Sequence, residues 1–231
     1  MANEYPVKNS ANRSSFSISG KQAGELIASA CHAFCAGYPF TLLLTISWGR
    51  AGIKCRPQEA TTDYLKAVGD WLGTGRSYVW VLEHPVGKSE HVHVLLHVPP
   101  EKIEKFLKLK DDWAGRIGAT PQERGQIVDA KRITGSHPEW DVFLYLDNLK
   151  KIVRYLLKGV DIAAAPALGI VYKPQGMILS KRVGTSELLT ENGRAKDEAR
   201  RNLNPVWYEG RRHFRLLDLA HLSLDRFVEK E

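Results

Sequence analysis

The segment 77–98, SYVWVLEHPVGKSEHVHVLLHV, constrains the fold more than any other part of the chain. Two runs rich in apolar, β-branched and aromatic residues flank PVGKS, a short stretch with the proline and glycine typical of a turn. This pattern predicts two strands paired as an antiparallel hairpin. We therefore expect a fold built around a β-sheet.

The rest of the chain supplies further strands and helices. The segment 40–48, FTLLLTISW, is a nearly continuous apolar run and predicts a central strand, whereas 124–133 suits an edge strand. Apolar residues at helical spacing predict helices at 56–72, 99–117 and 136–159, the last with Ser136 and Glu139 as a capping box. The predicted order is βαββαβα, an α+β fold with helices packed on a central antiparallel sheet.

We expect three regions in the chain. An N-terminal arm and helix occupy 1–36, the sheet domain occupies 37–165, and a basic C-terminal extension that could contact DNA occupies 166–231. The 33 Lys and Arg residues outnumber the 26 Asp and Glu residues, and the resulting charge of +7 favours polyanionic partners such as nucleic acid. Three cysteines cannot all pair and no secretory signal opens the chain, so we expect a cytoplasmic location. No apolar run approaches the roughly 18 residues of a membrane span.

Histidines alternate with apolar residues on the second strand of the hairpin. Because residues two apart on a strand share a face, the side chains of His91, His93 and His97 lie on one side of the sheet. His91 and His93 are close enough to share one metal ion, whereas His97 lies toward the end of the strand. Solvent-facing histidines alternating with core valines would give the same pattern without any metal.

The partner strand decides the third ligand. If residues of equal parity face each other, Glu83 completes a site of two imidazoles and one carboxylate, which suits Mg²⁺ or Mn²⁺. A shift of one residue would bring His84 there instead, and three histidines suit Zn²⁺. We favour Glu83 as the third ligand.

A tyrosine on the helix 136–159 is a candidate nucleophile. At 100° per residue, Lys151 and Lys158 lie within about 60° of Tyr155, at the border of the apolar stripe. Ammonium groups beside a phenol favour the phenolate and can bind the phosphate that it attacks. A tyrosine in this position also commonly serves only for packing. Tyr145 is a possible second hydroxyl.

Together these motifs resemble those of the HUH endonuclease superfamily, which includes rolling-circle replication initiators, relaxases and transposases. The strand 40–48 resembles the first strand motif, HVH (91–93) the metal motif, and YLLK (155–158) the nucleophile motif. The similarity covers about residues 38–160. HVHVLLHVPP is also similar to single-tyrosine transposases, but Lys158 stands where those usually have Gln or Asn, which favours the replication-initiator branch.

The resemblance implies a mechanism. Glu83, His91 and His93 would hold a divalent cation, Mg²⁺ or Mn²⁺, against a phosphate of single-stranded DNA at a hairpin or origin. Tyr155 would attack that phosphate, leaving a 5′-phosphotyrosine and a free 3′-hydroxyl, and Lys158, with Lys151, would neutralise the phosphate. Because no GxxxxGK[ST] loop is present, a host helicase would be the expected partner.

Further basic and aromatic residues could track a DNA strand. These are Arg50, Lys181, Arg182, Trp207, Arg211 and Arg212. Two other functions remain open. One is a zinc hydrolase using His84, His91 and His93, and the other is a nucleic-acid-binding module without catalysis.

Overall fold

The computed structural model describes residues 14–73, 76–120, 127–136 and 141–202. The strands are β1 (Ser14–Ser15), β2 (Leu42–Ile46), β3 (Tyr78–Glu83), β4 (His91–Leu96), β5 (Val128–Arg132), β6 (Ile178–Leu179) and β7 (Val183–Thr185). The α-helices are α1 (Gly20–Cys35), α2 (Pro57–Leu72), α3 (Ile103–Arg116), α4 (Val142–Leu156) and α5 (Glu191–Asn202). Short 3₁₀ helices include η4 (Leu157–Gly159), which continues α4 by one turn.

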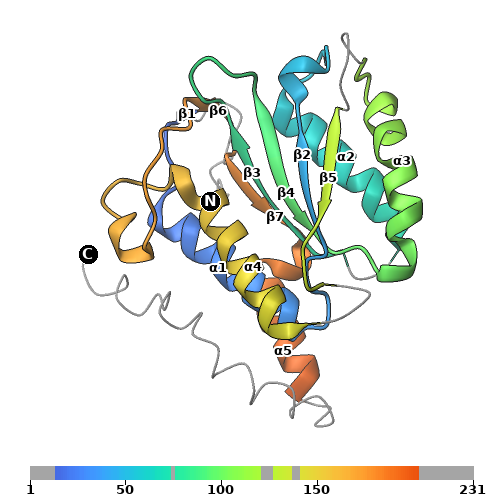
Figure 1. Ribbon diagram of the computed structural model, residues 1–231, viewed down its shortest axis with the longest axis vertical. Helices are drawn as coiled ribbons and strands as arrows, with labels where there is room; N and C mark the ends of the chain where they lie inside the picture. Colours follow the sequence, from blue (N-terminus) through green and yellow to red (C-terminus); the bar gives the residue numbers. More distant parts are fainter. Residues whose placement is uncertain (1–13, 74–75, 121–126, 137–140, 203–231) are drawn as a thin grey trace, which may run out of the picture.

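Five strands form the central sheet in the order β5-β2-β4-β3-β7 (Figure 1), and every neighbouring pair is antiparallel. The predicted antiparallel sheet with helices is confirmed, as are the hairpin, the central strand and the edge position of β5. Strand β7 was not predicted. β1 and β6 form a separate two-stranded ladder.

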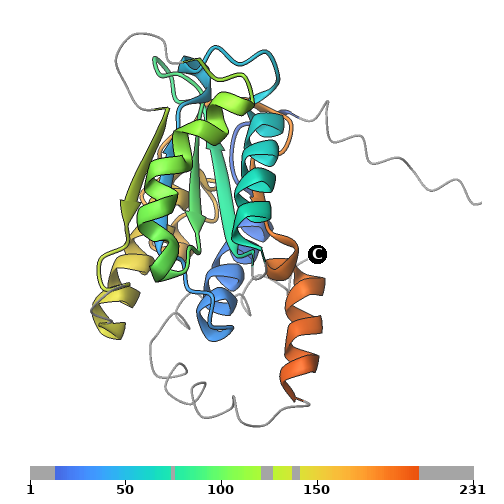
Figure 2. The ribbon, with the colours of Figure 1, turned by 90° about the vertical axis from the view of Figure 1, so that its right-hand side faces the viewer.

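Helices cover both faces of the sheet. α1 and α4 pack on the face formed by Val79, Val81 and Leu95, where they share one apolar core. α2 and α3 pack on the opposite face and lie in front of the sheet in Figure 2. Because both faces of β2 are covered, its sequence LLLTI is nearly all apolar rather than alternating.

Helix α4 begins later than we predicted. Asp141 is its N-cap, and the Asp141 side chain accepts a hydrogen bond from the Leu144 N–H. The expected cap Ser136 is buried and precedes the helix, while Glu139 lies outside the described residues. The short carboxylate of Asp141 satisfies an N–H of the first turn, which is what an N-cap requires.

The sheet and its cores extend beyond the predicted domain of residues 37–165. Leu26 and Ile27 of α1 belong to the same core as Val153 of α4, and β7 pairs with β3 from beyond residue 165. The described parts of all three predicted regions therefore share one apolar core. None of the described helices is long and apolar enough to cross a membrane.

A buried arginine joins three distant segments. Arg182 is 1% exposed, and its guanidinium donates to the carbonyl oxygens of Ser15, Gly176 and Leu82. These contacts bind the N-terminal segment and the segment before β6 to β3. We predicted that Arg182 contacts DNA, but its guanidinium is buried and donates to backbone carbonyls and to the Ser15 hydroxyl, so it stabilises the fold instead.

Candidate metal centre and tyrosine site

The hairpin of β3 and β4 brings three potential metal ligands together at one end of the sheet. In its register Glu83 lies directly opposite His91, and His93 follows two residues later on the same face. The predicted register is confirmed. His84 is exposed, and its backbone N–H donates to the carbonyl oxygen of Gln175. Glu83, His91 and His93, hereafter the triad, are the described group with metal-ligand geometry.

The triad converges on one carboxylate oxygen. Oε2 of Glu83 lies 3.4 Å from Nε2 of His91 and 3.5 Å from Nε2 of His93. One ligand atom from each residue lies within 4.8 Å of the others. Glu83 is 1% exposed, and its Oε2 accepts no hydrogen bond from the described residues. A buried carboxylate oxygen without a hydrogen-bond donor costs free energy of folding, and a bound cation would offset that cost. The arrangement therefore fits a metal ion.

Two further contacts fix the imidazole rings. Nδ1 of His91 donates to the carbonyl oxygen of Ser89 at 2.9 Å, so its Nε2 is free of a proton when the ring is neutral. Nδ1 of His93 lies 3.0 Å from the hydroxyl oxygen of Thr45 on β2. Such contacts hold Nε2 in the orientation that a metal ligand needs. Both rings therefore present Nε2 to Glu83.

Tyr155 and Lys158 lie against the triad, and Lys158 lies beside Tyr155 as the helical spacing predicted. The hydroxyl oxygen of Tyr155, at the end of α4, is 3.3 Å from Nε2 of His93. Nζ of Lys158 in η4 is 2.5 Å from Oε1 of Glu83 and 3.9 Å from the centre of the Tyr155 ring. Tyr155 is 47% exposed, so the phenol stands at the solvent side of a buried centre.

The electrostatics of the site follow from burial and from Glu83. Burial raises the pKa of Glu83, but the two imidazoles and Lys158 outweigh it and hold that pKa far below its usual range. Burial lowers the pKa of His93 and that of Lys158, against the attraction of Glu83 in both cases. Glu83 is thus the fixed negative charge of the site.

The expected activation of the phenol by lysine is not found. Burial, and then the charge of Glu83, raise the pKa of Tyr155. Lys158 forms its ion pair with Glu83 rather than with a phenolate. Lys151 is exposed and pairs with Asp147 at 2.6 Å, one turn earlier in α4. A cation at the triad would offset the charge of Glu83 and so favour the phenolate.

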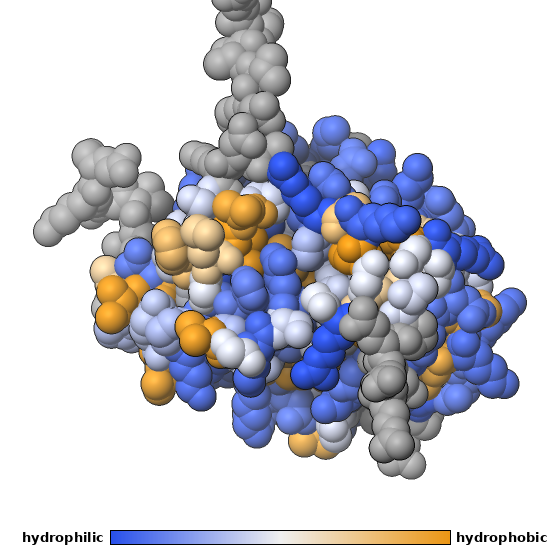
Figure 3. All heavy atoms as spheres, turned by 90° about the horizontal axis from the view of Figure 1, so that it is seen from above, coloured by the Kyte–Doolittle hydropathy of each residue, from blue (hydrophilic) through white to orange (hydrophobic). Residues whose placement is uncertain are grey.

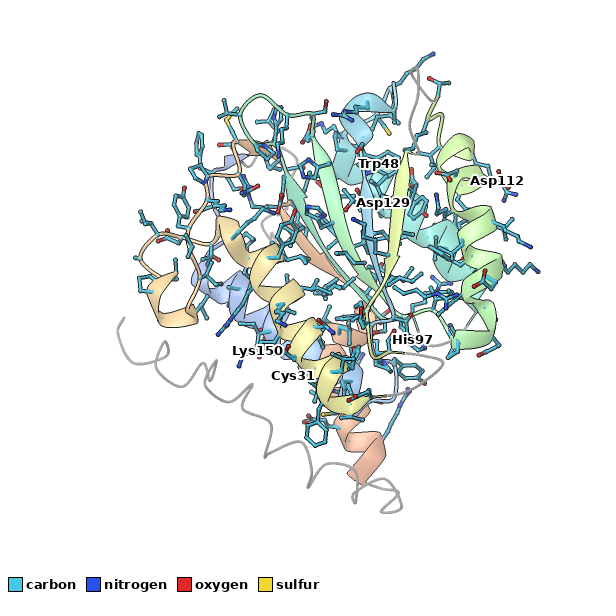
Figure 4. All side chains as sticks on the ribbon, in the orientation of Figure 1. Cys31, Trp48, His97, Asp112, Asp129 and Lys150 are labelled. Carbon is cyan, nitrogen blue, oxygen red and sulfur yellow. The ribbon has the colours of Figure 1, made fainter. Side chains whose placement is uncertain are left out.

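The remaining predicted residues lie elsewhere. Tyr145 is fully buried and stacks on Phe34, so it offers no second surface hydroxyl. His97 lies at the lower end of the sheet in Figure 4, with its Nδ1 2.6 Å from the carbonyl oxygen of Pro39. Arg50 and Lys181 are exposed. Trp207, Arg211 and Arg212 lie outside the described residues.

Sequence reasoning missed Thr45 as a partner of His93. The feature of the sequence that could have indicated Thr45 is its position as the polar residue of an otherwise apolar strand, LLLTI. Assigning it required the knowledge that β2 lies beside β4, where Thr45 is directly opposite His93.

Comparisons with known proteins identify no relative. No protein family, no curated protein and no solved structure matches this chain.

Proposed function

We propose that the protein is a metal-dependent endonuclease that nicks single-stranded DNA and transfers the strand through a 5′-phosphotyrosine at Tyr155. The observation that carries this proposal is the 3.3 Å distance between the Tyr155 hydroxyl and Nε2 of His93. It places a half-exposed phenol beside a buried group of metal ligands.

The triad suits a divalent cation that keeps open coordination positions. Two imidazoles and one carboxylate provide three protein ligands, which leaves room for water and substrate oxygens. Held there, Mg²⁺ or Mn²⁺ would supply positive charge that polarises a scissile phosphodiester.

The chain's own residues would carry the covalent step. The Tyr155 oxygen attacks phosphorus after its proton passes to solvent, to which the phenol is open. A bond from this oxygen to phosphorus forms, and the bond from phosphorus to the 3′-oxygen breaks. The leaving oxygen takes a proton and becomes a free 3′-hydroxyl, and Lys158 stabilises the charge that develops on the phosphate. Attack by a hydroxyl on the phosphotyrosine rejoins a strand without other energy input.

This chemistry suits rolling-circle replication of a plasmid, phage or mobile element, with a host helicase as partner in the cytoplasm. Lys158 at the third position after the tyrosine supports the replication-initiator branch of the HUH superfamily over a single-tyrosine transposase. The zinc hydrolase with three histidines loses support, because His84 is not part of the triad.

The test is a covalent adduct. Incubation with labelled single-stranded hairpin DNA and Mn²⁺, followed by denaturing electrophoresis, should shift the protein band. Tyr155→Phe should abolish the shifted band while it retains DNA binding, because only the nucleophilic oxygen is lost. Tyr38→Phe is the matched control, since Tyr38 packs on His97 away from the triad. An unaltered band in Tyr155→Phe, or no band with the wild type over a library of hairpins, would rule out the mechanism.

A further inference from the structure

Three lysines come from segments that border the triad, and one of them, Lys158, contacts it. Lys158 is in η4, Lys88 is in the turn 84–90 that joins β3 to β4, and Lys173 follows η4 along the chain. The backbone N–H of Lys173 donates to the carbonyl oxygen of Lys158 at 2.7 Å. Burial lowers the pKa of Lys158 against the attraction of Glu83, and the charges of Lys88 and Lys173 add a smaller contribution in the same direction as burial. We call these three residues the lysine cluster.

The backbone anchors the two outer lysines to the site. The N–H of Lys88 donates to the carbonyl oxygen of Pro85 at 3.0 Å, which closes the turn beside Glu83. The segment after Lys173 packs on the start of the same turn, where Gly176 has a φ of 66° and no space for a Cβ atom beside the carbonyl of His84. Both lysines are exposed, and Figure 3 views the molecule from the end that carries this turn.

Of the three charges in the lysine cluster, only that of Lys158 is balanced by an ion pair among the described residues. Glu83 pairs with Lys158 and is shared with both imidazoles. Neither Lys88 nor Lys173 forms an ion pair with a described carboxylate. A divalent cation at the triad would make this region still more positive. One phosphodiester carries a single negative charge, so the lysine cluster suits several linked phosphates better than one small anion.

We propose that Lys88 and Lys173 bind phosphates next to the scissile one, so that the substrate of this site is a polyanionic strand rather than a small phosphate ester. This inference rests on the proposed function and extends it to residues outside the HVH and YLLK motifs. Lys158 serves the reacting phosphate, and the two outer lysines hold the flanking backbone. Their contacts carry no sequence information, because every nucleotide offers the same phosphate.

The salt dependence of binding tests the inference. The full chain with Tyr155→Phe, which cannot form the adduct, is titrated with a labelled oligonucleotide in Mn²⁺ at several salt concentrations, and fluorescence anisotropy gives Kd. Each of Lys88→Ala and Lys173→Ala should reduce the slope of log K against log salt by about 0.7, and the double variant by roughly 1.4. Lys88→Arg and Lys173→Arg should keep the wild-type slope, because the charge is retained.

The matched control is the double variant Lys105→Ala, Lys108→Ala. Both lysines are exposed on α3, which covers the opposite face of the sheet. This variant should have the same slope of log K against log salt as the Tyr155→Phe protein without it. Equal slopes for the outer-lysine and control variants would overturn the inference. If the salt slopes of the outer-lysine and control variants are equal while the wild type still forms the covalent adduct, the proposed function stands without the inference. If the outer-lysine variants lower the slope but no adduct forms, the strand-binding inference stands without the nicking activity.

Discussion

At the scale of single residues, the candidate site depends on side chains that hold the metal ligands as much as on the ligands themselves. Thr45 lies opposite His93 on the neighbouring strand, and its hydroxyl contacts Nδ1 of His93 at 3.0 Å. The Glu83 carboxylate is likewise held by Lys158 through its second oxygen. These contacts orient donor atoms that a strand alone would leave free to rotate.

Replacing Thr45 should weaken metal binding. Thr45→Val keeps the shape of the side chain but removes the partner of His93 Nδ1, and we expect a loss of about 10- to 100-fold in Mn²⁺ affinity. Isothermal titration calorimetry measures this. Thr45→Ser retains a hydroxyl and should stay close to wild type; an equal loss in both variants would point to packing rather than to ring orientation.

His97 should make stability depend on pH although it takes no part in the site. Burial lowers its pKa, so the folded state favours the neutral ring. In the unfolded chain, His97 takes up a proton as pH falls below its ordinary pKa of 6.5, whereas the folded protein keeps the ring neutral to a lower pH. The stabilisation is therefore present above pH 6.5 and is lost as pH falls through the folded pKa.

The comparison for this effect is His97→Asn, which does not titrate and retains a donor for the Pro39 carbonyl. Between about pH 7.5 and about pH 5.5, the free energy of unfolding should fall more for the wild type than for the variant. Urea titrations at each pH provide the values. Parallel curves would show that His97 does not change its protonation on folding.

At the scale of elements, the sheet contains a close contact at its unpredicted edge. Gly184 of β7 lies opposite Trp80 of β3, and a Cβ atom at this position would overlap the indole ring. Gly184→Val should therefore force the strand or the ring to move, at a cost of about 1–3 kcal/mol in the free energy of unfolding.

Gly115→Ala in α3 is the control for the glycine at 184, because no atom lies within 4 Å of the position that the added methyl carbon would take. It should be neutral or stabilise by up to about 1 kcal/mol, since alanine favours helix. Urea unfolding of both variants checks the pair. A Gly184→Val protein as stable as wild type would mean that β7 is not packed tightly on β3.

The sequence allowed some elements to be predicted and not others, for physical reasons. The hairpin followed from two apolar runs flanking a short turn, but its register was open between Glu83 and His84. Glu83 was favoured because a carboxylate suits phosphate chemistry, and the register of the two strands confirms it. That Lys158 lies beside Tyr155 followed from helical spacing, whereas their position at the triad was implied only by the resemblance to a family. By contrast, β7 is a short VGT strand without a hydrophobic pattern. The contact of Thr45 with His93 depends on which strands are neighbours, and that order comes from tertiary packing.

At the scale of the whole molecule, Arg182 joins segments that are far apart in the chain. Its partners Ser15 and Leu82 come from the N-terminal segment and from the strand that ends in Glu83. The sequence presented it only as one cation in a basic stretch. Its burial could not be predicted from sequence, because it depends on how the N-terminal segment and the segment before β7 pack beside β3.

Removing this arginine should destabilise the whole fold. Arg182→Met leaves buried carbonyl oxygens without donors, and we expect a loss on the order of 3 kcal/mol in the free energy of unfolding. Arg182→Lys should recover little, because one ammonium cannot reach the carbonyls that the planar guanidinium spans. Lys181→Met at the exposed neighbouring position is the control, and urea unfolding is the measurement. A wild-type midpoint for Arg182→Met would show that these contacts contribute no stability.

The burial of Tyr145 has a consequence for the stoichiometry of the proposed reaction. Within the described residues, Tyr155 is the phenol that meets the triad, while Tyr145 is enclosed in the core. A phenol that carries a DNA end cannot attack another until a hydroxyl displaces that end. Each molecule would hold one severed strand at a time. It could cut a second strand only after a 3′-hydroxyl has displaced the first from Tyr155, so holding two severed strands at once would require a second copy of the protein.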